Sequence, residues 1–208
     1  MVKRNVMTYH MKKPATKSKR DAYHHGDLRR TLLEAARSEI TAHGAQSLSL
    51  ASLARRAGVA QSAPYRHFAD RDELLAAVAT HGFEAFTAVL QAASEAGSRA
   101  GAIKRIGAAY LRFGEEHTQL YRLMFASSLV AGTAEGSELR TAAWASFEPL
   151  LGRVADGAPS KQSRLAAYAI WAQLHGFVML RADGLLDEPA EELLKGLRSR
   201  ADHGMTGG

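Results

Sequence analysis

Apolar residues recur at helical spacing along most of the chain, and no segment carries the signals of a β-strand. Glycine, serine and proline interrupt this pattern and mark the ends of about nine predicted helices. The expected ranges are 27–43, two turns between Ser49 and Gly58, a short helix starting near Gln61 or Ser62, 70–93, 103–117, 119–129, 137–155, 160–182 and 188–200. The pattern therefore predicts an all-α fold.

Residues 48–75 predict two short helices that are joined by a tight turn and followed by a long helix. Leu50, Leu53 and Ala54 fall on one face of the first helix at i, i+3, i+4 spacing. Gly58 ends that helix at a position where a positive φ costs glycine little. A helix, a short glycine turn and a second helix form the arrangement that places a helix in the DNA major groove.

Capping residues predict where these helices begin. Ser49 suits the N-cap of the first helix, but Ser52 stands three residues later where a capping box has Glu or Gln, so the box is incomplete. Asp70 and Glu73 form a complete box at the start of the long helix. Pro64 lies in the second helix, and proline is tolerated in a first turn, so that helix should be short.

Several residues also combine into longer motifs: Tyr23-His24-His25-Gly26-Asp27-Leu28-Arg29, Leu53-Ala54-x-x-Ala57-Gly58-Val59, Tyr65-x-His67-Phe68, Arg71-x-Glu73-x-Leu75 and Trp171-x-x-x-His175-Gly176. Through them the chain resembles the tetracycline-repressor (TetR) family, and the last motif resembles the C-terminal domain of a branch marked by Trp-His-Gly. The resemblance implies an N-terminal three-helix helix-turn-helix domain at 23–75. It also implies a C-terminal helical ligand-binding and dimerisation domain at 76–202. Composition predicts a basic flexible arm at 1–22 and a glycine-rich, flexible tail at 203–208.

The resemblance further implies which residues meet DNA. Tyr65 and His67 match family residues that commonly reach phosphates, whereas Phe68 is expected to pack inside the domain. Arg66 can pair with guanine and Gln61 with adenine. The predicted DNA-binding residues are Ser49, Gln61, Ser62, Ala63, Pro64, Tyr65, Arg66, His67 and, as a phosphate anchor, Arg71.

Charge is distributed unevenly along the chain. Residues 1–71 carry 14 Lys and Arg against 5 Asp and Glu, whereas residues 72–208 carry 13 against 16. The positive part contains the helix-turn-helix, which favours a polyanionic partner such as double-stranded DNA. Residues 1–22 are basic with only Asp21 opposing, which is typical either of a disordered solubilising tail or of an arm that follows DNA phosphates.

Residues 160–182 are apolar on nearly every face, so this helix should lie at the centre of its domain, at a subunit interface, or at both. The resemblance implies that the last two helices pair with their copies in a four-helix homodimer bundle. The residues expected at that contact are Leu174, Phe177, Val178, Leu193, Leu194 and Leu197. The candidates for lining a ligand cavity are Tyr110, Phe113, Tyr121, Phe125, Trp144, Phe147, Trp171 and His175. Ordinary core packing is the competing interpretation of every residue in this last set.

The sequence points to no catalytic residue, metal or cofactor. Nucleophile, phosphate-loop and zinc motifs are absent, and His24-His25 lacks the HxxxH spacing of a metal site. The chain has no Cys, and its longest uncharged run, 165–180, is shorter than the about 20 residues that span a bilayer. We therefore expect a cytoplasmic protein without a membrane partner.

These observations favour a homodimeric repressor that binds a palindromic operator and is released by a small, largely apolar effector of unknown identity. One alternative is a helix-turn-helix regulator that has no small-molecule effector or that acts as an activator. Another is an all-α enzyme or lipid carrier whose likeness to a helix-turn-helix protein is accidental.

Overall fold

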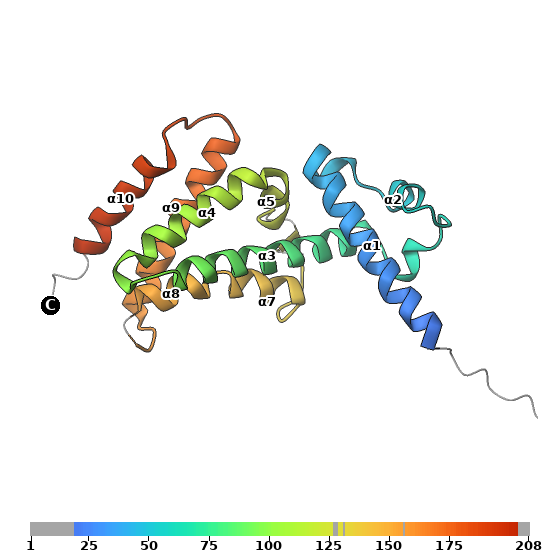
Figure 1. Ribbon diagram of the computed structural model, residues 1–208, viewed down its shortest axis with the longest axis horizontal. Helices are drawn as coiled ribbons and strands as arrows, with labels where there is room; N and C mark the ends of the chain where they lie inside the picture. Colours follow the sequence, from blue (N-terminus) through green and yellow to red (C-terminus); the bar gives the residue numbers. More distant parts are fainter. Residues whose placement is uncertain (1–18, 127–128, 131, 156, 204–208) are drawn as a thin grey trace, which may run out of the picture.

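The computed structural model describes the backbone of residues 19–126, 129–130, 132–155 and 157–203, which form helices and no strand (Figure 1). The predicted all-α fold is therefore confirmed. The α-helices are α1 (Lys19–His43), α2 (Leu50–Arg56), α3 (Arg71–Glu95), α4 (Ala102–Glu116), α5 (Thr118–Met124), α7 (Glu138–Ala145), α8 (Glu148–Val154), α9 (Lys161–Ala182) and α10 (Ala190–His203). The 3-10 helices are η1 (Ala45–Ser47), η2 (Pro64–Arg66) and η3 (Arg99–Gly101).

Helix α3 runs through most of the length of the molecule and joins its two parts (Figure 1). The Asp70 carboxylate accepts the Glu73 N–H at 2.8 Å and caps this helix, as the sequence pattern predicts. The first turns of α3 bury Leu74 against the part that contains α1, and later turns bury Phe86 and Leu90 among the remaining helices. The predicted domain boundary at residue 75 therefore falls inside one continuous helix.

The larger part of the molecule packs α4, α5, α7 and α8 along α3, and α9 covers α4 and α8. Helices α4 and α9 approach closely at Gly114, where an added Cβ would lie 2.4 Å from Cγ1 of Val178. Real Cβ atoms do not come that close to another carbon, so only glycine fits this crossing. Helix α10 then packs on α4 and α9 at the end of the molecule (Figure 1).

Two helix boundaries differ most from the sequence prediction. Helix α1 begins at Lys19 rather than Asp27, because the intervening residues contain no proline and a single glycine costs only about 1 kcal/mol in a helix. The arm predicted at 1–22 is therefore helical from Lys19, and residues 1–18 lie outside the described ones, as do residues 204–208 of the predicted tail. The helix expected at 119–129 ends as α5 at Met124.

The single helix predicted at 137–155 is two helices, α7 and α8. Pro149 has no N–H to donate to a carbonyl one turn earlier, so the first helix cannot continue through it. The proline lies instead in the first turn of α8, where an N–H would have no helical partner.

Candidate functional site

The start of α2 is built by two serines. The Ser52 N–H donates to Oγ of Ser49 at 3.1 Å, and the Ser49 N–H donates to Oγ of Ser52 at 3.3 Å. The capping box is therefore complete, which corrects the prediction that Ser52 leaves it open, because a serine hydroxyl can replace the Glu carboxylate as acceptor. After α2, Gly58 takes a φ of +66°, so the turn uses the left-handed conformation that the sequence indicated.

The recognition segment, residues 61–68, is not the α-helix that the sequence predicts as the second helix of the helix-turn-helix. It is a run of turns that closes in η2, with the Arg66 N–H donating to Ala63 O and the His67 N–H to Pro64 O. Pro64 cannot donate an N–H, and Ala60 has no side-chain oxygen that could cap the start of a helix. Both features favour short i→i+3 turns over a regular α-helix.

The side chains predicted to meet DNA divide by burial. Those of Gln61, Ser62, Tyr65 and Arg66 are exposed, with Tyr65 at 57%. Those of Ala63 and His67 are half-buried. Pro64 is buried, which argues against its predicted DNA contact, and Phe68 is buried with the Arg29 guanidinium 5.3 Å from its ring centroid.

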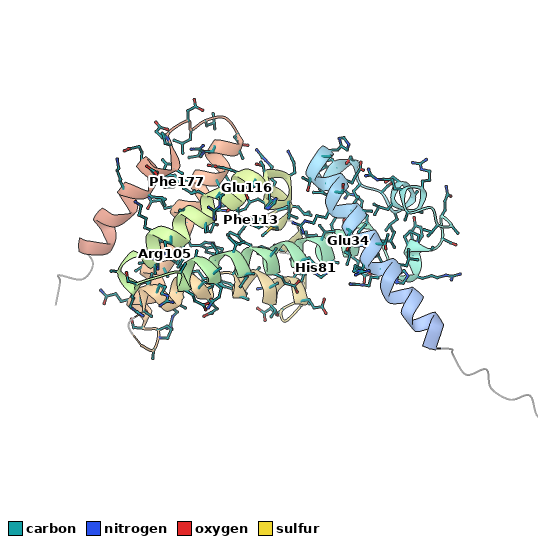
Figure 2. The ribbon with its side chains drawn as sticks, in the orientation of Figure 1. Glu34, His81, Arg105, Phe113, Glu116 and Phe177 are labelled. Carbon is teal, nitrogen blue, oxygen red and sulfur yellow. The ribbon has the colours of Figure 1, made fainter. Side chains whose placement is uncertain are left out.

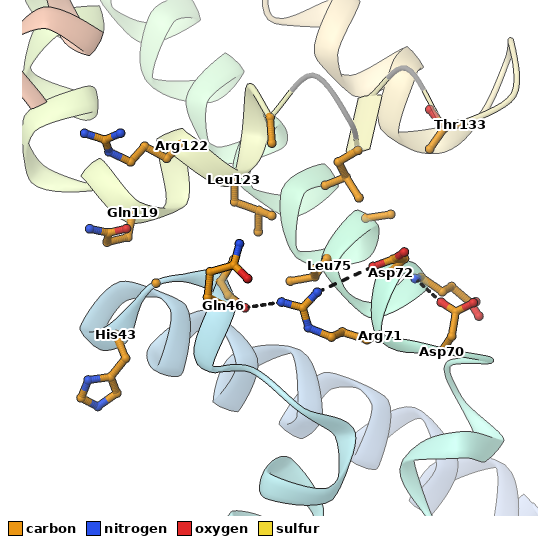
Figure 3. A pocket seen from close by; sticks show the side chains of 17 residues that line it. His43, Gln46, Asp70, Arg71, Asp72, Leu75, Gln119, Arg122, Leu123 and Thr133 are labelled. Carbon is orange, nitrogen blue, oxygen red and sulfur yellow. Dashed lines mark hydrogen bonds and ion pairs between the residues drawn. The ribbon is translucent and has the colours of Figure 1, made fainter. Parts of the chain in front are cut away.

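Arg71, the predicted phosphate anchor, has internal partners. Its Nε donates to Leu48 O at 2.9 Å and one terminal nitrogen donates to Ala45 O at 2.6 Å (Figure 3). The guanidinium therefore ties the start of α3 to the loop between α1 and α2. Its role toward phosphate stays a prediction.

A cleft of about 800 Å³ separates this loop from α5. Figure 3 shows Gln119, Arg122 and Leu123 of α5 facing Gln46 and Arg71 across it. A second cleft, of about 550 Å³, lies between α1 and α3, where Figure 2 labels Glu34 and His81. Neither cleft is lined by any residue of the predicted ligand-binding set.

Most of that predicted set instead forms one packed group, which we call the aromatic cluster. Its members are Phe86, Tyr110, Phe113, Tyr121, Phe125, Phe147, Trp171 and His175. Phe113 points from α4 toward α3, where its ring centroid lies 4.8 Å from that of Phe86 (Figure 2). Trp144 is 51% exposed and makes none of these ring contacts, so the structure separates it from the other candidates.

A chain of hydrogen bonds crosses the aromatic cluster. The hydroxyl oxygens of Tyr110 and Tyr121 lie 2.8 Å apart, and the Tyr121 hydroxyl lies 2.7 Å from Nδ1 of His175. Burial lowers the pKa of His175 below its usual value, and it raises the pKa of both tyrosines well above theirs. A neutral His175 can accept a hydrogen bond at Nδ1 from the Tyr121 hydroxyl. The Tyr121 oxygen can then accept a hydrogen bond from the Tyr110 hydroxyl.

The residues predicted at a dimer contact lie mostly inside the subunit. Leu174 and Val178 are at most 2% exposed and Leu194 is 3% exposed, so their own subunit already covers them. This burial argues against a direct contact of these three residues with a second copy, and the dimer contact itself stays a prediction. Phe177 and Leu193 are half-buried, and the side chain of Leu197 lies outside the described residues.

The opposite side of α9 carries an apolar surface that the sequence prediction missed. This α9 stripe consists of Leu165, Ala169, Ala172, Gly176 and Leu180. Its spacing keeps the five residues on one face, and all but the half-buried Gly176 are exposed. The periodicity was present in the sequence, but because α9 is apolar on most faces, it did not show which face the subunit leaves uncovered.

Two general properties complete the description. No group of three or more potential metal ligands occurs among the described residues. Within the same part of the chain, one helix, α3, is long and apolar enough to cross a membrane by length and composition alone, and 44% of its apolar window is buried inside the molecule.

Comparison with known proteins finds a matching family model for each of the two parts of the chain. Residues 32–78 match the family described as bacterial regulatory proteins, tetR family, and residues 103–197 match the tetracyclin repressor-like C-terminal domain. An uncharacterised HTH-type transcriptional regulator of Haemophilus influenzae is 30% identical over 154 residues, which is 73% of each chain. A similar regulator of Mycobacterium tuberculosis is 24% identical over 86% of this chain and 85% of its own.

Solved structures agree with this assignment. A protein of unknown function from Rhodococcus sp. RHA1 superposes with a TM-score of 0.71 and 35% identity, covering 88% of this chain and 95% of its own. A TetR family transcription regulator from Marinobacter aquaeolei has the same fold, with a TM-score of 0.64 at 20% identity over 87% of this chain and 97% of its own. The protein described above therefore belongs to the TetR family of helix-turn-helix transcriptional regulators.

Proposed function

We propose that the protein is a homodimeric repressor that binds a palindromic operator and releases it when a small, largely apolar effector binds. The observation that carries the proposal is the exposed segment after α2, where Gln61, Ser62, Tyr65 and Arg66 offer phosphate and base contacts from a basic part of the chain. The α9 stripe supplies an uncovered apolar face for a second copy. Two-fold symmetry then requires two half-sites about one helical turn, roughly 34–36 Å, apart.

The direct experiment is selection of bound sequences from a random DNA pool, followed by sedimentation of the complex. A palindromic consensus bound by a dimer supports the proposal. A monomeric complex, or no enrichment at any salt concentration, contradicts it.

A regulator without a small-molecule effector, which includes an activator, is the second candidate. The observation that favours it is the dense packing of the aromatic cluster, since neither described cleft reaches that cluster. A thermal-shift screen for compounds that also lower DNA affinity separates the two candidates. We also propose that the chain belongs to the Trp-His-Gly branch, because Trp171, His175 and Gly176 occur in this order on α9. We further propose that the protein works in the cytoplasm.

Substitutions at Tyr65 and Arg66 should affect DNA binding differently. We expect Tyr65→Ala to weaken binding to specific and non-specific DNA alike, because phosphate contacts position a protein without selecting sequence. Arg66→Ala should relax the base preference at one position of each half-site, at a cost of about 1–3 kcal/mol. Repeating the selection with each variant measures both effects. An unchanged consensus at unchanged stringency for Arg66→Ala would remove this residue from base readout.

Arg71 allows a test of two roles. Because its guanidinium already donates to Ala45 O and Leu48 O, we expect Arg71→Gln to lower operator affinity by disordering the α1–α2 loop. The slope of log affinity against log salt should then stay unchanged. A phosphate anchor would instead make that slope shallower by about 1 for each subunit. Arg71→Lys keeps the positive charge but cannot make both hydrogen bonds to the loop carbonyls. Its operator affinity should therefore fall as in Arg71→Gln only if these two hydrogen bonds are what the residue contributes.

A further inference from the structure

The larger of the two described clefts lies between the DNA-binding part and the rest of the molecule, and we call it the junction cleft. One wall is formed by η1 and the start of α3, and the other by α5 and the residues that follow it (Figure 3). Its volume of about 800 Å³ falls within the range of about 300–1,000 Å³ that is typical of small-molecule sites. The junction cleft is therefore large enough for a ligand that touches both parts at once.

The most buried residues that line the junction cleft are apolar. Leu75 of α3 and Leu123 of α5 are each 5% exposed and belong to the hydrophobic core. Ala76, the next residue on α3, adds a half-buried methyl group. These side chains form an apolar base against which a ligand can bury an apolar face.

The arginine and acidic side chains of the junction cleft already have partners. The Arg71 guanidinium donates to two loop carbonyls, and that of Arg122 pairs with the carboxylate that follows α9. The carboxylates of Asp70 and Glu73 each accept a backbone N–H near the start of α3, and that of Asp72 lies 3.8 Å from the Arg71 guanidinium. A charged ligand would therefore lose hydration without gaining an unpaired opposite charge, which favours an uncharged ligand.

Two glutamines supply the hydrogen-bonding groups of the junction cleft. Gln46 reaches it from η1 and Gln119 from α5 (Figure 3), and both side chains are exposed. Neither side-chain amide hydrogen-bonds to another group in the part of the chain that the structure describes, so each can exchange water for a ligand. An amide presents an N–H donor beside a C=O acceptor, and a cis-amide edge, as in a lactam, is complementary to that pair.

We propose that the junction cleft is the effector site, and that the effector is a small uncharged molecule with a flat apolar body and a cis-amide edge. The body lies on Leu75 and Leu123, and the edge hydrogen-bonds to Gln46 and Gln119. This inference rests on the ligand response in the proposed function and gives that response a place and a ligand chemistry.

The walls of the junction cleft connect such a ligand to DNA binding. Gln46 lies in the loop whose carbonyls Arg71 holds, and α2 begins shortly after it at Leu50. The walls meet at Gly44, where an added Cβ would lie 3.2 Å from Oε1 of Gln119. Helix α2 lies on the side of α1 away from α5 (Figure 1), so the ligand itself stays off the DNA surface. A ligand that bridges the walls changes how the two parts sit together, and hence how two recognition segments fit two half-sites.

The test compares two flat, uncharged probes that differ by one methyl group. Carbostyril has a cis-amide edge on a two-ring body, and N-methylcarbostyril has the same body but no N–H. Calorimetry on the full-length protein measures both affinities. We expect carbostyril to bind at least about fivefold more tightly, because the methyl group leaves a glutamine acceptor unpaired. Quinaldate, a flat anion of similar size, should bind more weakly than carbostyril.

A pair of tryptophan variants locates the site. Ala76→Trp places a large ring in the junction cleft and should lower carbostyril affinity at least about tenfold by occupying the ligand's space. Ala85→Trp places the same ring in the cleft between α1 and α3 and should leave that affinity unchanged. Both alanines are half-buried on α3, so the two variants are matched in element and burial. Ala76→Leu is the milder block if Ala76→Trp does not fold.

A pair of glutamine variants tests the recognition of the amide edge. Gln119→Met keeps the length of the side chain but removes its amide, so it should reduce the preference for carbostyril over N-methylcarbostyril. Gln91→Met changes an exposed glutamine of α3 that lines neither described cleft, and it should keep the preference. An unchanged preference in both Gln119→Met and Gln46→Met would overturn the proposed amide contacts.

The remaining outcomes separate this inference from the proposed function. No binding of carbostyril, equal affinity for the two probes, or full affinity in folded Ala76→Trp or Ala76→Leu would overturn the inference. These measurements need no DNA, so failure to select any operator would contradict the proposed function alone. Carbostyril should also lower the affinity for the selected operator by roughly fivefold or more. Binding in the junction cleft without any change in operator affinity would show that this cleft is not the effector site.

Discussion

Replacing Gly176 by arginine should convert the proposed dimer into folded monomers and abolish specific operator binding. Gly176 lies in the middle of the α9 stripe, between Ala172 and Leu180. Within the subunit an added Cβ at this position meets nothing within 4 Å, so the arginine does not disturb the core. Small residues on such a face allow a second helix to approach closely, and in a two-fold contact each substituted residue lies near its own copy.

The expected loss of operator affinity is about 100-fold or more, because a monomer can hold only one half-site and loses the benefit of linked binding. Sedimentation at micromolar concentration measures the oligomeric state, and fluorescence anisotropy with the selected operator measures affinity. Gly152→Arg is the matched control, since Gly152 is exposed on α8 and its Cβ would also meet nothing within 4 Å. A dimeric Gly176→Arg variant with normal operator affinity would place the subunit contact elsewhere.

The sequence alone suggests Leu194 as a position at which to place a charge in the dimer contact. Such a substitution would test the stability of the monomer instead of the contact. Leu194 is 3% exposed inside the subunit, so an arginine there would be buried without a partner and would destabilise the monomer. Loss of DNA binding in that variant would not distinguish a broken interface from an unfolded protein.

Gly114→Ala should destabilise the subunit by about 2–3 kcal/mol, because the new methyl group overlaps with Val178. The added Cβ would lie 2.4 and 2.7 Å from the two γ-carbons of Val178, and α4 and α9 would have to separate. Gly152→Ala is the opposite control, since it fills open space and should stabilise α8 by up to about 1 kcal/mol. Urea denaturation measures both differences in the free energy of unfolding.

Shortening Val178 should rescue the Gly114 substitution. In the pair Gly114→Ala and Val178→Ala, the methyl group of one residue takes space that the other gives up, so the two effects should couple by about 1–3 kcal/mol. Additive losses would show that the close approach of α4 and α9 is not the source of the instability.

Local signals explain why much of the fold could be predicted. The cap at Asp70 and the apolar spacing of α3 lie close together in the sequence, and a helix depends mainly on such nearby residues. The turn at Gly58 was predictable for the same reason, because positive φ is a property of one residue. Boundaries were less certain where several weak signals compete, as at Pro149 and in the recognition segment.

The candidate site was predictable only in part. The exposed Tyr65 and Arg66 follow from a local motif, whereas the partners of Arg71 are carbonyls more than twenty positions away, which no local pattern reveals. The sequence also grouped Trp144 with Trp171, and packing separated them.

The sequence by itself determined that the chain is all-α, that a glycine turn and a capped long helix follow one another, and that its basic part contains the DNA-binding motif. These features depend on neighbouring residues and on charge, which the order of amino acids contains directly. The tertiary structure decided which face of α9 is buried and how Phe125 reaches the aromatic cluster. Those properties depend on contacts between residues far apart in the chain, so only the packed helices could show them.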